Sequence, residues 1–309
     1  YAAMQKKTFN LIVILGPTAS GKTKLAARLA RDRGSEIISA DSRQVYKGMD
    51  IGTGKDIGEY VVDGLVVPCH LIDVVEPDYE FSVFDYQVNF SRVFTDISSR
   101  GVVPIMVGGS GLYIEAAIKG YRLLEVPENP LLRYELEKEG MNELRNRLIG
   151  LKPAVHNTTD LMDRKRLVRA IEIMEFTKAH NYQETYYPSI VPLAVGIRWE
   201  RSVLRERITD RLNARLKTGM IEEVEGLYRS GMGWEKLDFF GLEYRYVGLY
   251  LRGVMSYSEM FQKLNTRIHQ FAKKQETWFR RMEKQGTKIH WINGDDYGKA
   301  AEIINELMK

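Results

Sequence analysis

The sequence predicts an α/β protein: a core in which a parallel sheet is flanked by helices, plus an all-helical insertion domain. Short apolar runs alternate with helical patterns in the first third of the chain, as in parallel sheets covered on both faces. A glycine-rich turn lies between the first apolar run and the first helix. The middle of the chain has charged helical patterns and no convincing strand.

The first elements follow from their apolar patterns. Phe9–Leu15 is apolar and predicts a buried strand, and the turn after it leads into a helix at about Gly21–Arg31. Three further strands are expected at Ile37–Ser39, His70–Val74 and Val102–Val107. A helix is expected before the last of them, at Val83–Arg100.

The segment 121–188 differs from both of its neighbours. Helical patterns lie at Asn129–Leu148 and Asp160–Lys178. Strand composition returns afterwards at Val191–Trp199 and Lys288–Ile292, with the longest helix expected between them at Ser256–Lys284. This order favours one α/β core, residues 4–120 and 189–309, that is interrupted by a helical insertion, over two consecutive domains.

Composition excludes several classes of protein. The chain has 309 residues, of which 44% are hydrophobic and 28% charged, as is ordinary for a globular protein. The apolar run Leu11–Leu15 is far too short to cross a bilayer. A single cysteine, Cys69, excludes an intramolecular disulfide and a thiolate zinc cluster. We expect a cytoplasmic monomer without membrane association.

Basic residues are concentrated in two places. Residues 263–284 contain seven lysines and arginines against two glutamates. A second cluster is Arg164-Lys165-Arg166 with Arg169. Such blocks are typical either of nucleic-acid contacts or of a solvated helix face.

The glycine-rich turn has the form G-x-x-x-x-G-K-[ST], with a strand before it and a helix after it. In this motif the backbone N–H groups face one anion, the lysine adds a point charge and the last hydroxyl ligates magnesium. The turn therefore predicts a P-loop NTPase-like core that holds a di- or triphosphate with Mg²⁺. Its residues are Gly16, Pro17, Thr18, Ala19, Ser20, Gly21, Lys22 and Thr23.

This phosphate loop does not identify the phosphate compound. A strand that ends in aspartate commonly supplies a magnesium ligand beside such loops, and Asp41 and Asp73 both fit that pattern. No kinase lid or guanine-reading motif can be assigned. A small-metabolite kinase and a non-catalytic RNA-binding ATPase module are therefore alternatives at this level.

Longer motifs resemble one family. The block Ser39–Lys55 reads SADSRQVYKGMDIGTGK, and it is followed in order by HLID at 70–73, VGGSGLY at 107–113, RLVRAIE at 166–172 and AKKQETWFR at 272–280. Together with the phosphate loop, these motifs are similar to the tRNA dimethylallyltransferase (tRNA isopentenyltransferase) family over nearly the whole chain.

The resemblance implies transfer of a dimethylallyl group from its diphosphate to the N6 amine of the adenosine immediately 3′ of the anticodon. The phosphate loop would then hold the prenyl diphosphate. Asp41 resembles the general base that accepts the amine's proton. Lys22, magnesium on Thr23 and Arg211 would stabilise the leaving diphosphate. Ser110 stands where the family usually has threonine, close to the donor.

The resemblance also implies contacts with the anticodon stem-loop. An adenosine that is turned out of the base stack of the anticodon loop needs polar and aromatic partners at the mouth of the pocket. The expected contacts with the acceptor are Asp41, Ser42, Arg43, Gln44, Lys165, Arg166, Arg169, Tyr244, Arg245, Lys273, Lys274 and Arg280. One segment departs from the family, which commonly has Ile-Gly-Tyr-Lys/Arg-Glu where this chain has Phe-Gly-Leu-Glu-Tyr-Arg at 240–245.

Simpler roles remain open for several of these residues. Asp41 could be a helix cap or a magnesium ligand, Arg211 a surface residue, and Ser110 a turn residue. His70 and Asp73 are expected to be structural, as is at least one of the aromatic residues Trp278 and Phe279. A related alternative function is prenylation of free adenine nucleotides, which would not require the insertion or the basic C-terminal helix.

Overall fold

The computed structural model describes residues 8–121, 123, 125–151, 161–180 and 187–309. Its contacts divide the chain into two compact units. The core unit consists of the segment up to Gly120 together with Pro188–Lys309, and the insertion unit is Tyr121–Tyr187. These bounds lie within a residue of the expected 121–188 insertion. Residues 4–7 of the expected core and Asp160, the expected start of a helix, lie outside the described residues.

The core unit is built on a six-stranded parallel sheet with the strand order β5-β2-β6-β1-β7-β8. In the register of the sheet, Gly108 at the end of β6 lies beside both Leu15 of β1 and Ala40 of β2. The segments that follow these three strands therefore start at the same edge of the sheet, where ligands of open α/β sheets bind. The strands are β1 Leu11–Leu15, β2 Ile37–Ala40, β5 Cys69–His70, β6 Ile105–Gly108, β7 Pro192–Arg198 and β8 Ile289–Asn293.

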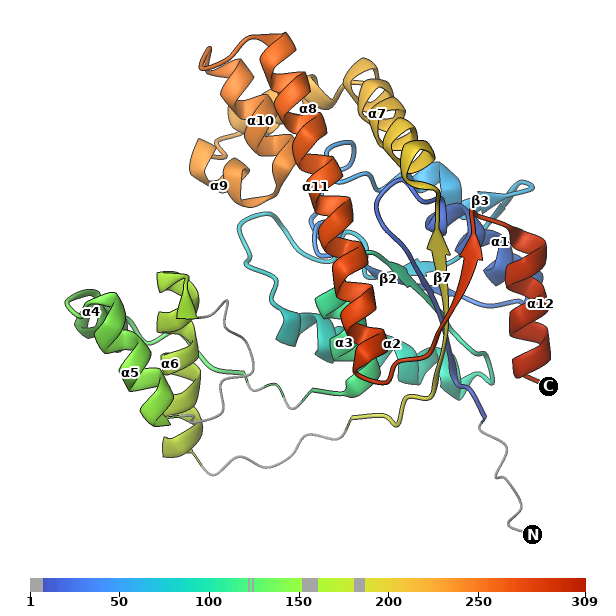
Figure 1. Ribbon diagram of the computed structural model, residues 1–309, viewed down its shortest axis with the longest axis horizontal. Helices are drawn as coiled ribbons and strands as arrows, with labels where there is room; N and C mark the ends of the chain where they lie inside the picture. The colour runs from blue at the N-terminus through green and yellow to red at the C-terminus, as the bar shows by residue number, and fades with distance from the viewer. Residues whose placement is uncertain (1–7, 122, 124, 152–160, 181–186) are drawn as a thin grey trace. The chain divides into compact units, whose positions relative to one another are not determined.

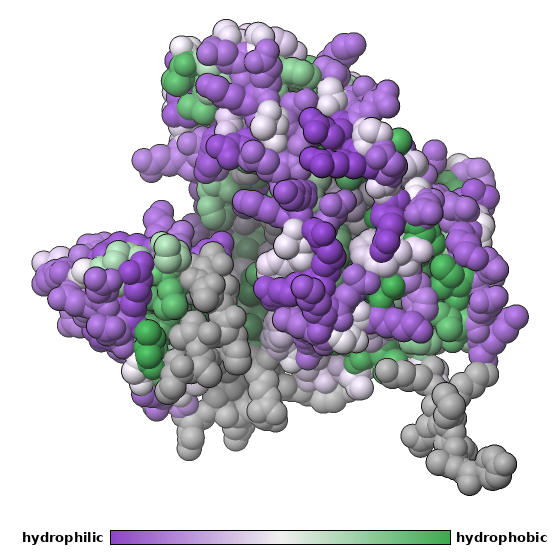
Figure 2. All heavy atoms as spheres, viewed as in Figure 1, coloured by the Kyte–Doolittle hydropathy of each residue, from purple (hydrophilic) through white to green (hydrophobic). Residues whose placement is uncertain are grey.

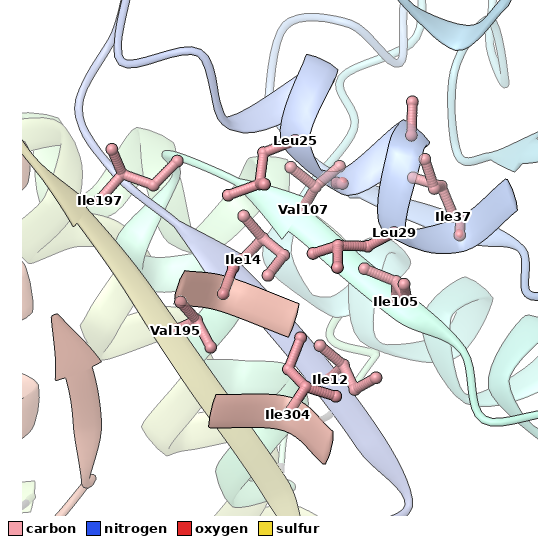
Figure 3. Close-up of a cluster of buried hydrophobic side chains, with 14 of the residues drawn as sticks. Ile12, Ile14, Leu25, Leu29, Ile37, Ile105, Val107, Val195, Ile197 and Ile304 are labelled. Atoms are coloured by element: carbon pink, nitrogen blue, oxygen red, sulfur yellow. The ribbon is translucent and has the colours of Figure 1, made fainter. Parts of the chain in front are cut away.

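Helices α1 and α12 pack against each other and against the sheet (Figure 1). They cover a cluster of buried aliphatic side chains that comes from β1, β6 and β7 as well as from the two helices (Figure 3). All five residues of β1 are fully buried, as the uninterrupted apolar run predicts for a central strand. The helices are α1 Lys22–Asp32 and α12 Tyr297–Leu307.

Other parts of the core unit complete this frame. Helix α2, Val83–Ser99, begins at a Ser82–Asp85 capping box and packs on α3, Gly111–Lys119, where Tyr86 stacks on Tyr113. A short helix at Ile57–Tyr60 leads into the hairpin β3 Val61–Val62 and β4 Leu65–Val66.

The second half of the core unit is mainly helical. The longest helix, α11, packs against α7 and α10 and extends to α3 (Figure 1). Phe279 of α11 is fully buried, which confirms that at least one of the two neighbouring aromatic residues belongs to the core. The helices are α7 Arg201–Lys217, α8 Met220–Arg229, α9 Trp234–Phe239, α10 Leu242–Leu251 and α11 Tyr257–Lys284.

The insertion unit is helical in its described part. Its helices are α4 Pro130–Glu137, α5 Met141–Leu151 and α6 Arg164–Ala179, and they share a core of leucine and isoleucine side chains. Glu172 is buried on α6 and binds the side chains of Arg133 and Arg169. The helical pattern expected at Asn129–Leu148 corresponds to two helices, because the chain turns at 138–140 between α4 and α5.

The strand expected at His70–Val74 is also wrong, because β5 ends at His70. Leu71 and Asp73 have φ angles of 64° and 52°, which a strand does not permit. The segment turns because the Asp73 carboxylate pairs with Lys55 and the Asp73 amide donates to the Gln44 carbonyl. Asp73 is thus structural, as expected, and so is His70, which binds Glu36 at 2.7 Å.

None of the helices in the described ranges is both long and apolar enough to cross a lipid bilayer.

Candidate active site

A cavity of about 1000 Å³ opens at the carboxyl edge of the sheet in the core unit. Its walls are residues 18–23 of the phosphate loop, residues 41–44 after β2, residues 52–54, and side chains from α7, α9, α10 and α11. This volume is at the upper end of the range for small-molecule pockets. The cavity therefore joins the phosphate loop to the segment that carries Asp41.

The phosphate loop is fixed by donors from distant parts of the chain. Ala19 and Gly21 have φ angles of 60° and 86°. The indole Nε1 of Trp199 donates to the Ser20 carbonyl at 3.0 Å, and Arg207 Nε donates to the Ala19 carbonyl at 2.9 Å. Arg207 also lies over the Trp199 ring, 4.3 Å from its centroid. These contacts hold the unusual backbone of the loop in one conformation.

Lys22 lies in the cavity wall with its Nζ donating to the Pro17 carbonyl at 3.2 Å. Burial, with the nearby charge of Arg211, lowers the pKa of its ammonium group to about 8, while Asp41 opposes the shift. Thr23 also lines the cavity. The Lys22 ammonium therefore loses its proton at a pH near 8.

This pKa predicts how catalysis depends on pH. The charged ammonium is the form that attracts a diphosphate, and it loses its proton as the pH rises through about 8. We expect kcat/KM for the prenyl donor to fall above that pH, because kcat/KM reports the free enzyme. In Lys22→Arg the fall should vanish from this range, since a guanidinium stays charged. A profile for the wild-type protein that stays flat up to pH 10 would contradict the assignment.

Asp41 follows β2 directly and is not a helix cap. Its Oδ1 accepts a hydrogen bond from the backbone N–H of Arg43 at 2.9 Å, in an Asx turn. Ser110 precedes α3, but its hydroxyl does not cap that helix. Instead, Ser110 Oγ accepts the backbone N–H of Ser42 at 3.0 Å. Ser110 thus holds the segment that carries Asp41.

Arg211 lies in the cavity wall, one turn along α7 from Arg207. Its guanidinium donates to Thr18 Oγ1 and to the Gly54 carbonyl, both at 3.3 Å, and it pairs with Asp56. The arginine is therefore a bridge between the phosphate loop and the 41–55 segment, and not a surface residue of a solvated helix.

One turn further along α7, Arg215 also faces the cavity. Its Nη1 lies 3.4 Å from Glu243 Oε1, and its Nε is buried without a hydrogen-bond partner in the described structure. Its guanidinium occupies the space where a side chain on Gly54 would begin, so Gly54, at φ 65°, admits no larger residue. Burial raises the pKa of the Glu243 carboxyl, against the effect of Arg215.

Residues 46–55 are held by two charged side chains, Lys55, which is buried, and Glu223, which is partly buried. Lys55 is 1% exposed and binds Asp50, Asp73 and the Tyr46 carbonyl. Glu223 of α8 accepts the backbone N–H groups of residues 50, 51 and 52 at 2.7–2.9 Å, and the Tyr244 hydroxyl at 2.7 Å. This wall of the cavity is therefore a fixed surface.

Removing the Glu223 anchor should destabilise the protein. In Glu223→Ala, three backbone N–H groups and one hydroxyl lose their acceptor. We expect the free energy of unfolding to fall by about 1–3 kcal/mol, measured by urea denaturation. The control is Glu222→Ala, which removes an exposed carboxylate from the same turn. Equal losses in the two variants would refute the anchoring role.

The expected RNA contacts lie in different places. Ser42, Arg43, Gln44 and Arg245 line the cavity. Among the expected contacts, Lys273, Lys274 and Arg280 are exposed on α11, and Lys165 and Arg166 are exposed on α6, in the insertion unit.

One of these expectations needs correction. Tyr244 is 1% exposed, so its hydroxyl serves Glu223 and its ring packs against Gly52 instead of meeting RNA. Arg169 pairs with Glu172 and donates to the Val126 carbonyl at 2.7 Å, but its side chain is partly exposed, and its contact with RNA stays a prediction.

Comparison with known proteins agrees with this geometry. The model of the IPP transferase family matches residues 44–282, and that of isopentenyl transferase matches residues 9–63. The tRNA dimethylallyltransferase 1 of Syntrophus aciditrophicus is 58% identical over 301 residues, which cover 97% of each chain. The chain belongs to the tRNA dimethylallyltransferase (IPP transferase) family. This confirms the family expected from the motifs.

Solved structures of the tRNA dimethylallyltransferase family extend the match to the fold. The full-length tRNA isopentenylpyrophosphate transferase of Bacillus halodurans is 33% identical, with a TM-score of 0.68 and 98% of each chain covered. A eukaryotic dimethylallyltransferase acting on tRNA has a TM-score of 0.76 over 97% of this chain and 77% of its own. At 21% identity, that second likeness supports the fold alone.

Several residues around this tRNA dimethylallyltransferase site were not found from the sequence. Arg207 and Arg215 lie four residues before and after Arg211, and this helical spacing could have indicated that all three share one face. Glu223 gave no signal, because most of its partners are backbone groups far away in the chain. Gln275 lies in the family motif at 272–280, but its backbone partners could not be read from that motif.

Proposed function

We propose that this protein transfers the dimethylallyl group of dimethylallyl diphosphate to the N6 amine of the adenosine immediately 3′ of the anticodon in tRNA. The observation that carries the proposal is one cavity lined both by cations and by a carboxylate. Lys22 and Arg211 stand at the phosphate loop after β1, and Asp41 follows β2, from which β1 is separated by β6 alone. Such a cavity suits an anionic leaving group and a weakly basic amine.

The phosphate-loop end would bind the donor and stabilise the departing diphosphate. Negative charge grows on the diphosphate as the allylic C–O bond breaks, and Lys22 and Arg211 are fixed where they can meet it. Binding in a preformed cationic site favours the transition state more than the ground state.

Magnesium would add to this charge stabilisation. The Thr23 hydroxyl lines the cavity next to Lys22. It would hold such an ion together with diphosphate oxygens and water, which is a common arrangement for Mg²⁺. When bound, the ion would neutralise charge on the diphosphate.

Asp41 would complete the reaction as the proton acceptor. The lone pair of an adenine amine is delocalised into the ring, so the amine needs to lose a proton as it attacks. The new N6–C bond forms as the allylic C–O bond breaks, Asp41 accepts the proton, and diphosphate leaves. The Asx turn to Arg43 fixes the carboxylate for this role.

The decisive experiment offers labelled dimethylallyl diphosphate to the protein with tRNA that lacks the modification. We expect label in the adenosine 3′ of the anticodon. Equal prenylation of AMP and of an anticodon stem-loop would instead support an enzyme of free nucleotides, and phosphate release from ATP would support a kinase or ATPase.

The basic face of α11 is the part of the core unit best suited to RNA phosphates. Lys273, Lys274 and Arg280 are exposed there, and Figure 2 shows mostly hydrophilic side chains over this helix. An anticodon stem spreads its charge over many phosphates, which separated basic residues can contact.

Replacing Lys273 and Lys274 by alanine should therefore weaken tRNA binding. We expect the slope of log K against log salt to become shallower by roughly 0.7–0.9 for each lost phosphate contact. Donor affinity in the absence of RNA should not change. A charge-matched control replaces Lys299 and Lys309, on and after α12. If both double variants bind tRNA like the wild type, α11 is not an RNA contact.

A further inference from the structure

Gln275 joins two loops that follow the adjacent strands β1 and β6. It lies on α11 and is 7% exposed. Its Oε1 accepts the backbone N–H of Thr18 in the phosphate loop at 2.8 Å, and its Nε2 donates to the Gly109 carbonyl, after β6, at 3.0 Å. One buried amide thus satisfies a donor and an acceptor from different loops.

Each of these loops leads to a reacting group. On the donor side, the Thr18 hydroxyl accepts a hydrogen bond from Arg211 at 3.3 Å. On the acceptor side, Gly109 precedes Ser110, whose hydroxyl holds the Ser42 amide beside Asp41. Gln275 is therefore linked to Arg211 through Thr18, and to the segment that carries Asp41 through Gly109 and Ser110.

Helix α11 packs closely against the loop after β6. A side chain on Gly109 would overlap Gln275 Nε2, and one on Gly111 would overlap the ring of Trp278, the next turn of α11. Close packing of this kind transmits small displacements, because a packed interior does not deform continuously. A displacement of α11 would therefore reach the loop after β6 through this packing, and the phosphate loop through the hydrogen bond between Gln275 and Thr18.

The opposite face of the same turn carries the exposed residues Lys273 and Lys274. The Thr18 backbone N–H is hydrogen-bonded to Gln275 and is not available to a ligand. Gln275 can therefore affect donor binding only through the shape of the phosphate loop. A ligand that holds α11 fixed would also hold the loop fixed, and a donor that binds afterwards would lose less conformational entropy.

We propose that Gln275 is a positioning residue that couples the basic face of α11 to the diphosphate site, so that RNA bound on this face tightens donor binding. The proposal rests on the proposed function. Thermodynamic linkage requires that the bound donor increase the affinity for RNA by the same factor. The effect is separate from the charge of Lys22 and Arg211, since Gln275 is neutral.

The test measures the donor Kd by calorimetry with and without a saturating anticodon stem-loop in which guanosine replaces the target adenosine, so that no transfer occurs. We expect RNA to lower the wild-type Kd by about tenfold, a typical coupling. In Gln275→Met the ratio of the two Kd values should fall close to one. In the matched control Gln262→Met, an exposed position on the same helix, it should stay at the wild-type value.

Hydrogen exchange gives a readout that needs no variant. With the stem-loop bound and the donor absent, amides of residues 16–23 should exchange more slowly in the wild-type protein. Unchanged exchange, a wild-type ratio of one, or a wild-type ratio in Gln275→Met would each overturn the coupling. These failures differ from a failure of the proposed function, which would appear as no prenylation of the unaltered stem-loop.

Discussion

Asp41→Asn should lower turnover by about 10²- to 10⁴-fold, the range for loss of a general base. Asparagine keeps the shape of the side chain and its oxygen can still accept the Arg43 amide, so the Asx turn survives. What is lost is the ability to take a proton from the amine. Single-turnover rates and separate Kd values for donor and tRNA would show whether binding is preserved while the chemical step slows.

The control for this substitution is Asp210→Asn. Asp210 also lines the cavity, but it is an exposed residue of α7 beside Arg211. Its replacement removes one negative charge from the same cavity and should leave turnover within a few-fold of the wild type. If Asp41→Asn retains wild-type turnover, Asp41 is not the base, and if both variants slow equally, the effect is one of charge.

Lys22→Ala should lower kcat and also weaken donor binding. The loss in kcat should be roughly 10²- to 10³-fold, as for removal of one electrostatic contact to a developing anion. The ammonium is held at the phosphate loop by the Pro17 carbonyl, so its position does not depend on the donor. Steady-state kinetics at several donor concentrations separates the two effects.

Lys24→Ala is the matched control, because it removes an exposed lysine from the first turn of the same helix. An unchanged kcat/KM for the donor in Lys22→Ala would remove the phosphate loop from the mechanism. A loss of the same size in Lys24→Ala would instead indicate a general effect of charge near the helix N-terminus.

The parts of the fold that follow from local pattern could be predicted from the sequence. The run Leu11–Leu15, the phosphate loop and α1 are specified by neighbouring residues, and their order implies the parallel sheet. The edge at which the cavity lies follows from the rule for open α/β sheets. The family motifs then identified Asp41 as a residue of the site.

What escaped prediction depends on contacts between distant segments. The segment after His70 looked like a strand, but Asp73 turns it to reach Lys55. Tyr244 looked available to RNA, but its hydroxyl is taken by Glu223. Side-chain bonds to remote backbone groups leave no periodic trace in a sequence, so periodicity could not reveal them.

The phosphate loop is encoded near the start of the chain, but the groups that shape it come from Trp199, Arg207 and Gln275. During synthesis, these groups leave the ribosome long after the motif itself. Strand β7, which lies beside β1 in the sheet, is also made late. A growing chain that ends before β7 contains the complete motif but none of these side-chain contacts, so the diphosphate site can be assembled only after the segment up to Gln275 has been made.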